Sequence, residues 1–442
     1  MLIMTALIVA SLAIDQISLL VFIILSLVSL FLSISRPALL IAIMPLFIIF
    51  LVPGPVSELS FERILAIFLF ISWLLRKMIR HEKFSKFSIF ILASAFPFLI
   101  AILTSLFGGV DFGSWFIKGI VYWLNRILII VILYEMLNTE EQSRLAMRSV
   151  IWTSLFLCII VISMSIFFCG RLDGLRAETC HQIPSNDYIK TLFVAVNTHA
   201  FTFAVALLFS WSLFFTKRRQ IPPRKLSPKL ILPTMIFLVA ILGYTLSRRG
   251  TLFLIPLILF FMWNYRKSSI VQIIFIGLLA VSVLIAFSQK EEDPLRIEET
   301  FNELQTSQGD RIPVWKLTME EIKKKPIFGW GAGAPNYIVI AYMGREYTLS
   351  STMLQIAFEM GVFGVISFSF FLFQCAKNVI KKIRNELNLP GYDRQLNYTF
   401  TALAMLSIFI ISSIVGNNLQ NIFSWYSLGV AFSLTKYRTD AM

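Results

Sequence analysis

The chain has 442 residues, of which 57% are hydrophobic and 14% charged, and its mean hydropathy is +0.78. A soluble domain of this size does not need so much apolar surface, so the composition excludes the ordinary soluble globular classes. The net charge of +14 could indicate nucleic-acid binding, but Lys and Arg also collect in the cytoplasmic loops of membrane proteins. We adopt the second interpretation and expect no nucleic-acid partner.

Apolar runs recur along the chain at lengths close to those that cross a bilayer. They lie at residues 2–14, 17–33, 38–52, 63–75, 87–107, 117–136, 149–169, 191–215, 230–246, 250–264, 270–287, 350–374, 397–415 and 418–435. Several are short and the first two could form a re-entrant pair, so the sequence predicts one all-α membrane domain over residues 1–442 with about 12 to 14 spans. The first run has no basic residues before it and no small-residue cleavage site, and we expect a retained segment rather than a signal peptide.

The segments between the runs fall into two sets that alternate along the chain. The basic set comprises residues 76–86, 216–229, 265–269, 376–395 and 436–442. The other set comprises residues 107–115, 171–190, 247–250, 288–349 and 416–420. The positive-inside rule predicts that the basic set is cytoplasmic, together with both termini, and that the long loop 288–349 lies on the outer face.

The long loop holds the most polar extended stretch of the chain, "GDRIPVWKLTMEEIKKKPIFGWGAGAP" at 309–335. Pro313 suits the first turn of a helix, where its missing N–H costs nothing, and Pro326 cannot continue one. We therefore predict one helix that is headed by Arg311 and ends before Pro326.

The predicted helix is amphipathic. Large apolar residues recur at i, i+4 and i+7, so that one stripe can lie on the membrane surface or against the bundle: Trp315, Met319 and Ile322. The charged residues are expected mainly on the other side: Glu320, Glu321 and Lys323 to Lys325.

A glycine-rich turn follows the helix. Its glycines permit a tight turn that brings backbone N–H groups near a ligand, and we predict substrate contacts at Gly329, Gly331 and Gly333. Because no Lys-Ser or Lys-Thr follows, the turn is not a nucleotide-binding P-loop.

Arginines gather on the predicted outer face at three places. They are Arg248 and Arg249 in "YTLSRRGTLFL", Arg311, and Arg176 in "GLRAET", with Glu178 and His181 close by. Each alone could be an arginine that snorkels to the interface. A guanidinium also binds two phosphate oxygens at once. Three such sites on one face favour a pyrophosphate carried on a lipid.

Two further features leave alternatives open. Arg126 falls near the middle of an apolar run, where it would either contact substrate or form a structural ion pair with Glu359. Cys169 and Cys180 could form a disulfide or remain unlinked, and the four cysteines show no metal-type spacing. The sequence contains no Asp-x-Asp motif, and we expect neither a divalent metal nor another cofactor.

Three pieces, in this order, resemble a known family: "TLSRRG", "GDRIPVWKLTMEEIKKKPIFGWGAG" and "SSTMLQIAFEMGVFG". Over residues 190–375 the chain is similar to the superfamily of O-antigen ligases and O-antigen polymerases, which are membrane glycosyltransferases that use undecaprenyl-diphosphate-linked glycans. The resemblance implies a fold like that of the C-type glycosyltransferases, a metal-independent reaction at the periplasmic face of a bacterial inner membrane, and a lipid-linked donor and acceptor. It also implies membrane lipids as surroundings and allows a chain-length regulator as a partner.

The resemblance also assigns roles. Arg311 and Arg248 match the family's arginines that hold the donor pyrophosphate, with Arg249 as the less certain match. Where the ligases have a histidine that helps to activate the acceptor, this chain has Ser350. Serine has no usable basicity near neutral pH, so this departure favours a polymerase over a lipid A–core ligase.

We expect two groups of catalytic residues. Arg311 and Arg248 would stabilise the departing pyrophosphate, and Arg249, Arg176 and Arg126 would contact substrate. The proton acceptor would come from His181, Glu178, Asp310, Glu346 or Glu359, of which we select the first two. The alternatives are an O-antigen ligase with a displaced base, a transporter or flippase, and a polymerase of another surface polysaccharide.

Overall fold

The computed structural model describes residues 31–32, 35–50, 61–169, 196–218, 253, 255–260, 311–334, 351–387, 393–415 and 422–436. This part of the chain consists of helices and turns, without a strand, as the sequence predicts. Four stretches are long and apolar enough to cross a membrane: Lys86–Gly108, Gly119–Met136, Thr352–Leu387 and Leu396–Ile414. Two shorter apolar helices, Phe201–Leu213 and Ile422–Leu434, accompany them. The protein is therefore a multi-pass, all-helical membrane protein, and its total number of spans stays a prediction.

The helices follow the predicted runs closely. In chain order they are α3 (Pro37–Phe50), α4 (Phe61–Arg80), α5 (Lys86–Thr104), the 3₁₀ helix η1 (Ser105–Gly108), α6 (Phe112–Ser114), the π-helix η2 (Trp115–Val121), α7 (Tyr122–Met136), α8 (Glu140–Cys169), α10 (Val196–Arg218), α15 (Arg311–Lys324), α17 (Thr352–Leu387), α18 (Asp393–Val415) and α19 (Ile422–Leu434). The runs at 2–14, 230–246 and 270–287, and nearly all of 17–33, lie outside the described residues.

One predicted boundary is wrong. We expected residues 376–395 to form a connecting loop, but α17 continues to Leu387 and α18 begins at Asp393. The apolar run ends where the helix leaves the apolar environment, whereas the helix itself continues because Lys, Arg and Glu are good helix formers.

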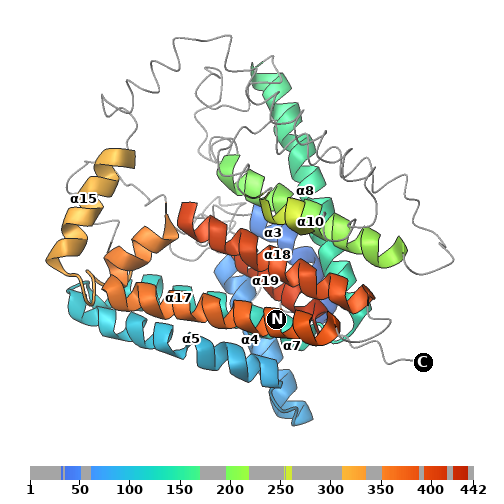
Figure 1. Cartoon of the computed structure of the whole chain (residues 1–442), viewed down its shortest axis with the longest axis horizontal. Helices are drawn as coiled ribbons and strands as arrows, with labels where there is room; N and C mark the ends of the chain where they lie inside the picture. Colours follow the sequence, from blue (N-terminus) through green and yellow to red (C-terminus); the bar gives the residue numbers. More distant parts are fainter. Residues whose placement is uncertain are drawn as a thin grey trace, which may run out of the picture.

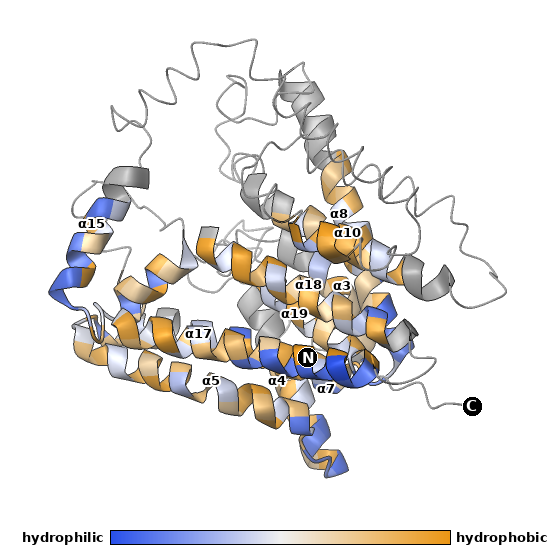
Figure 2. Ribbon diagram, viewed as in Figure 1, coloured by the Kyte–Doolittle hydropathy of each residue, from blue (hydrophilic) through white to orange (hydrophobic). Residues whose placement is uncertain are grey.

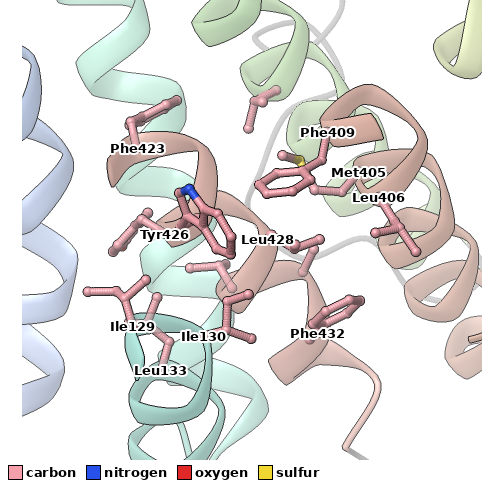
Figure 3. Packing of buried hydrophobic residues seen from close by; sticks show 14 of the residues in the cluster. Ile129, Ile130, Leu133, Met405, Leu406, Phe409, Phe423, Tyr426, Leu428 and Phe432 are labelled. Atoms are coloured by element: carbon pink, nitrogen blue, oxygen red, sulfur yellow. The ribbon is translucent and has the colours of Figure 1, made fainter. Parts of the chain in front are cut away.

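The core of the bundle is aromatic and aliphatic, and it lies where α7, α17, α18 and α19 meet (Figure 1). The Trp425 ring of α19 packs edge-on against Phe409 of α18, with ring centroids 5.0 Å apart. Figure 3 shows Phe409 and Met405 gathered with Leu428 around α19, and Ile130 on the neighbouring α7. This packing holds the helices that carry the candidate site.

A buried ion pair fastens α4 and α5 to α7 at one end of the bundle. Glu135 accepts hydrogen bonds from Lys77 Nζ at 2.9 Å and from the Ser85 backbone N–H at 2.9 Å. Its third donor is the Ser88 hydroxyl, and Ser85 also caps the N-terminus of α5. Lys436 lies at the same end, where its Nζ donates to the Tyr134 carbonyl oxygen at 3.0 Å.

The polar parts of the described chain gather at two ends (Figure 2). The basic segment 76–86 and Lys436 share the end that Glu135 holds together. Helix α15 lies at the opposite end, against η1 and the start of α17. Which end faces the cytoplasm stays a prediction from the charge pattern.

Candidate functional site

Helix α15 begins at Arg311 and ends at Lys324, with Pro313 in its first turn and Pro326 just beyond its end. These boundaries confirm the helix that the two prolines predict. Figure 1 shows α15 at the end of the bundle, set across the direction of α5 and α17.

The faces of α15 differ from the expectation in part. In the apolar stripe, Trp315 and Met319 are 46% and 54% exposed, whereas Ile322 is partly buried and packs against Ala334 and Phe358. Glu321, expected on the solvent side, is only 3% exposed. Its burial is tolerated because its Oε1 pairs with Lys324 Nζ at 2.5 Å. Its backbone carbonyl oxygen accepts the Trp330 indole N–H at 2.9 Å.

Helix α17 is kinked at Gly361, where the backbone has φ 66° and ψ −163°. The break releases backbone groups that the helix would otherwise pair, and the turn after α15 takes them up. Phe358 and Glu359 carbonyl oxygens accept from the N–H groups of Trp330 and Gly331, both at 2.9 Å.

In return, residues on the far side of the kink donate to the turn. The Val362 N–H donates to the Pro326 carbonyl oxygen at 2.8 Å, and the Phe363 N–H donates to the Ile327 carbonyl oxygen at 3.4 Å. We call the paired segments 326–331 and 358–363 the clasp. It fastens the polar segment directly to a membrane-spanning helix.

The glycines are what allow this pairing. Gly329 and Gly331 have φ of +70° and +102°, values that side chains other than glycine rarely adopt. The Gly329 N–H donates to the Lys325 carbonyl oxygen and the Gly331 N–H donates within the clasp, so these two amides already have protein partners. The roles of Gly329, Gly331 and Gly333 in substrate binding stay predictions, whereas their role in docking the turn is a finding.

Helix η1 supports the turn from the other side. Lys325 Nζ donates to the Gly108 carbonyl oxygen at 2.5 Å and lies 4.1 Å from the centroid of the Trp330 ring. The Ala332 N–H donates to Ser105 Oγ at 3.2 Å. The turn after α15 is therefore held between η1 and α17, and its Ala332 lies against Gly119 of the π-helix η2, a rare form that often marks functional sites.

A buried carboxylate lies beneath the clasp. Glu359 is 2% exposed, and its Oε1 accepts from Gln355 Nε2 at 2.7 Å. The Trp123 indole N–H and the Gly333 backbone N–H also face this carboxylate. A carboxylate buried at this depth without a cation is costly and often belongs to a functional site.

The expected ion pair between Arg126 and Glu359 is not formed. Arg126 is 5% exposed, its guanidinium carbon lies 3.3 Å from the centroid of the Tyr122 ring, and its NH1 donates to the Tyr122 carbonyl oxygen at 3.1 Å. A guanidinium can be buried this way because the ring face is negative and the carbonyl supplies an acceptor. A substrate contact by Arg126 stays a prediction.

Most of the other predicted site residues lie outside the described part of the chain. These are Arg176, Glu178, His181, Arg248, Arg249, Asp310, Glu346, Ser350 and Cys180. For Arg311 the structure gives the backbone position at the head of α15. Within the described residues, no cluster of three or more His, Cys, Asp or Glu could hold a metal ion. Metal independence stays a prediction.

Sequence reasoning missed the kink of α17 and the central place of Glu359. The available signal was "EMGVFG", in which two glycines follow an acid inside an apolar run. Ser351, next to the departure at Ser350, accepts the Leu354 N–H at 3.4 Å and so caps the start of α17.

Comparison with known proteins identifies the region that contains this arrangement. Residues 233–369 match a family described as O-antigen ligase. Proteins of Rickettsia conorii and Rickettsia felis that carry the provisional name polysaccharide ligase are 24% identical over 165 residues, which is 35% of this chain and 40% of theirs. A similarly named protein of Rickettsia prowazekii is 24% identical over 162 residues, 34% of this chain and 40% of its own. The similarity to these relatives thus covers about 40% of their length. The family match at residues 233–369 includes α15, the clasp and the first half of α17.

Proposed function

We propose that this membrane protein, whose residues 233–369 match a family described as O-antigen ligase, is a polysaccharide polymerase of the O-antigen ligase superfamily. In this proposal it transfers an undecaprenyl-diphosphate-linked glycan onto an incoming lipid-linked repeat unit. The reaction takes place at the periplasmic face of a bacterial inner membrane, without a metal ion.

The observation that carries the proposal is the attachment of an arginine-headed polar helix to a membrane-spanning helix. The clasp joins the turn after α15 to α17 at Phe358–Phe363, close to the N-terminal end of a candidate span. A diphosphate on a lipid lies at the boundary between the apolar layer and water. A helix held at that boundary is suited to present Arg311 to it.

The chemistry requires charge stabilisation. The acceptor hydroxyl oxygen forms a bond to the anomeric carbon of the donor while the bond from that carbon to the phosphate oxygen breaks. The diphosphate leaves with the electron pair, and the hydroxyl proton passes to a base, for which His181 and Glu178 are the candidates. Arg311 and Arg248, with Arg249 in support, offset the growing negative charge. A single such donor is worth about 2.7–4 kcal/mol elsewhere.

The position of Ser350 supports the polymerase over the ligase. A serine hydroxyl does not accept a proton near neutral pH, so an enzyme that needs a base there would be inactive. Ser351, which follows it, is used as a helix cap. The ligase with a displaced base remains the second candidate, because the names of the relatives favour it.

Deleting the gene separates these functions. Loss of a polymerase leaves the acceptor with a single repeat unit, whereas loss of a ligase leaves it bare while lipid-linked polymer accumulates. Purified protein that lengthens a lipid-diphosphate glycan in detergent would exclude transport as its main activity. Single-repeat acceptor in the deletion strain, restored by the gene, is the result we expect, and bare acceptor would reject the polymerase.

A further inference from the structure

A shallow groove of about 340 Å³ runs along the outer face of α15. It is lined by Trp315, Lys316, Met319, Glu320 and Lys323. From Trp315 to Lys323 the groove follows the helix for about 12 Å, at ~1.5 Å per residue. It begins one helical turn beyond Arg311.

Other residues of α15 form the face that packs inward: Thr318 and Glu321, which are 2% and 3% exposed. The groove lies on a different face, where Trp315 and Met319 are half-exposed. Exposing a large aromatic and a methionine side by side on a polar segment has a cost in water that a ligand would offset.

We propose that this groove binds sugar residues of the lipid-linked glycan, next to the diphosphate held by Arg311. The proposal rests on the proposed function, which supplies the glycan. The electron-rich face of an indole attracts the partly positive C–H bonds on the apolar face of a pyranose ring. Lys316 and Lys323 can donate hydrogen bonds to hydroxyl groups, and Glu320 can accept them.

A bilayer surface is the competing occupant, and the groove fits it less well. A helix that lies in the interface buries a broad apolar face and turns its charges to the other side. In the groove, Trp315 and Met319 stand beside three charged side chains, and Glu320 would face the anionic headgroups that lysines attract. Mixed charges around an aromatic side chain suit a polyhydroxylated ligand better than acyl chains.

The test uses the full-length protein in lipid nanodiscs and, as the probe, the lipid-free oligosaccharide released by mild acid from the host's own surface polysaccharide. Subtracting the fluorescence of a Trp315→Phe variant from that of the wild type isolates the Trp315 signal among the nine tryptophans. We expect the oligosaccharide to change this signal and Trp315→Ala to weaken binding about tenfold. Trp152→Ala is the matched control, because Trp152 is a tryptophan that is 65% exposed on α8, outside both the groove and the clasp. It should bind normally.

A second arm replaces the nanodisc lipids with brominated ones, which quench tryptophans in contact with acyl chains. Quenching of the Trp315 signal by these lipids, with no response to oligosaccharide, would assign the groove to the bilayer and overturn the proposal. Equal loss of binding in Trp315→Ala and Trp152→Ala would overturn it as well.

Failure of this inference can be told apart from failure of the proposed function. If Arg311→Ala abolishes polymer while Trp315→Ala leaves the oligosaccharide affinity and the KM for the lipid-linked donor unchanged, the groove is not a sugar site but the polymerase stands. If Trp315 governs oligosaccharide binding in a protein that never extends a lipid-linked glycan, the groove stands and the polymerase does not.

Discussion

Replacing Gly361 with alanine should open the clasp. Gly361 has φ 66° and ψ −163°, a backbone region essentially confined to glycine, where an L-residue costs about 1–3 kcal/mol. A Cβ there would lie 2.3 Å from the Ile327 carbonyl oxygen and 2.6 Å from the Pro326 carbonyl oxygen, so the turn must move away. Both carbonyl oxygens accept clasp hydrogen bonds, and each bond lost costs about 0.5–1.5 kcal/mol. The penalty on the docked turn therefore reaches several kcal/mol, enough to make the undocked form predominate.

Limited proteolysis measures this directly. Lys323 and Lys324 lie just before the clasp, and we expect trypsin to cleave there much faster in Gly361→Ala than in the wild type, with little polymer formed in cells. Gly113→Ala is the control, because its Cβ would meet nothing closer than 3.8 Å. Wild-type cleavage rates and full-length polymer in Gly361→Ala would refute the reasoning that the clasp holds α15 in its working position.

Three other changes test the site and the scaffold. Arg311→Ala should abolish polymer at normal expression, and Arg311→Lys should restore little of it because an ammonium group cannot bind two oxygens in a planar fork. The ladder of chain lengths on a polysaccharide gel measures both variants. A normal ladder in Arg311→Ala would show that Arg311 does not have this role. Ser350→Ala should leave polymer amount and length nearly unchanged, so a dead variant would show that this serine is catalytic. Glu135→Gln should lower thermal stability in detergent by an amount equivalent to about 3 kcal/mol, because it removes the buried carboxylate 2.9 Å from Lys77 and leaves only the more distant, more exposed Glu82 to pair with it. Glu82→Gln, which changes a more exposed carboxylate that also contacts Lys77, should cost much less, and equal losses would contradict this assignment.

The membrane helices were predictable because apolar length and charge are local properties of the sequence. The run at 87–107 became α5 with η1, Lys86 to Gly108, and the two prolines bounded α15. Where a helix continues beyond the apolar layer, as α17 does to Leu387, the apolar run underestimates it.

The site was less predictable because its geometry depends on contacts between distant segments. No local sequence pattern around Gly361 predicts that the helix breaks there, because glycines inside apolar runs also occur in straight membrane helices. The break is stable because residues more than thirty positions earlier supply hydrogen bonds to it. Glu321 was assigned to the wrong face for a similar reason, since its burial accompanies the turn that folds back after α15, from which the Trp330 indole N–H donates to the Glu321 carbonyl oxygen.

The clasp hydrogen bonds stabilise the docked turn, whereas the burial of the Glu359 carboxylate beneath it destabilises the docked turn. This opposition affects how completely the Gly361→Ala variant should undock. The Gly331 N–H donates to the Glu359 backbone carbonyl oxygen, while the carboxylate of Glu359 is buried, since the residue is only 2% exposed. The clasp bonds must therefore outweigh the cost of keeping that carboxylate from water. A substitution that displaces the turn removes the clasp hydrogen bonds and, at the same time, removes the cost of burying the carboxylate. Both effects favour the undocked form over the docked form. Partial undocking is then unfavourable, and trypsin should divide the Gly361→Ala population into few docked and many undocked molecules rather than loosen all of them slightly.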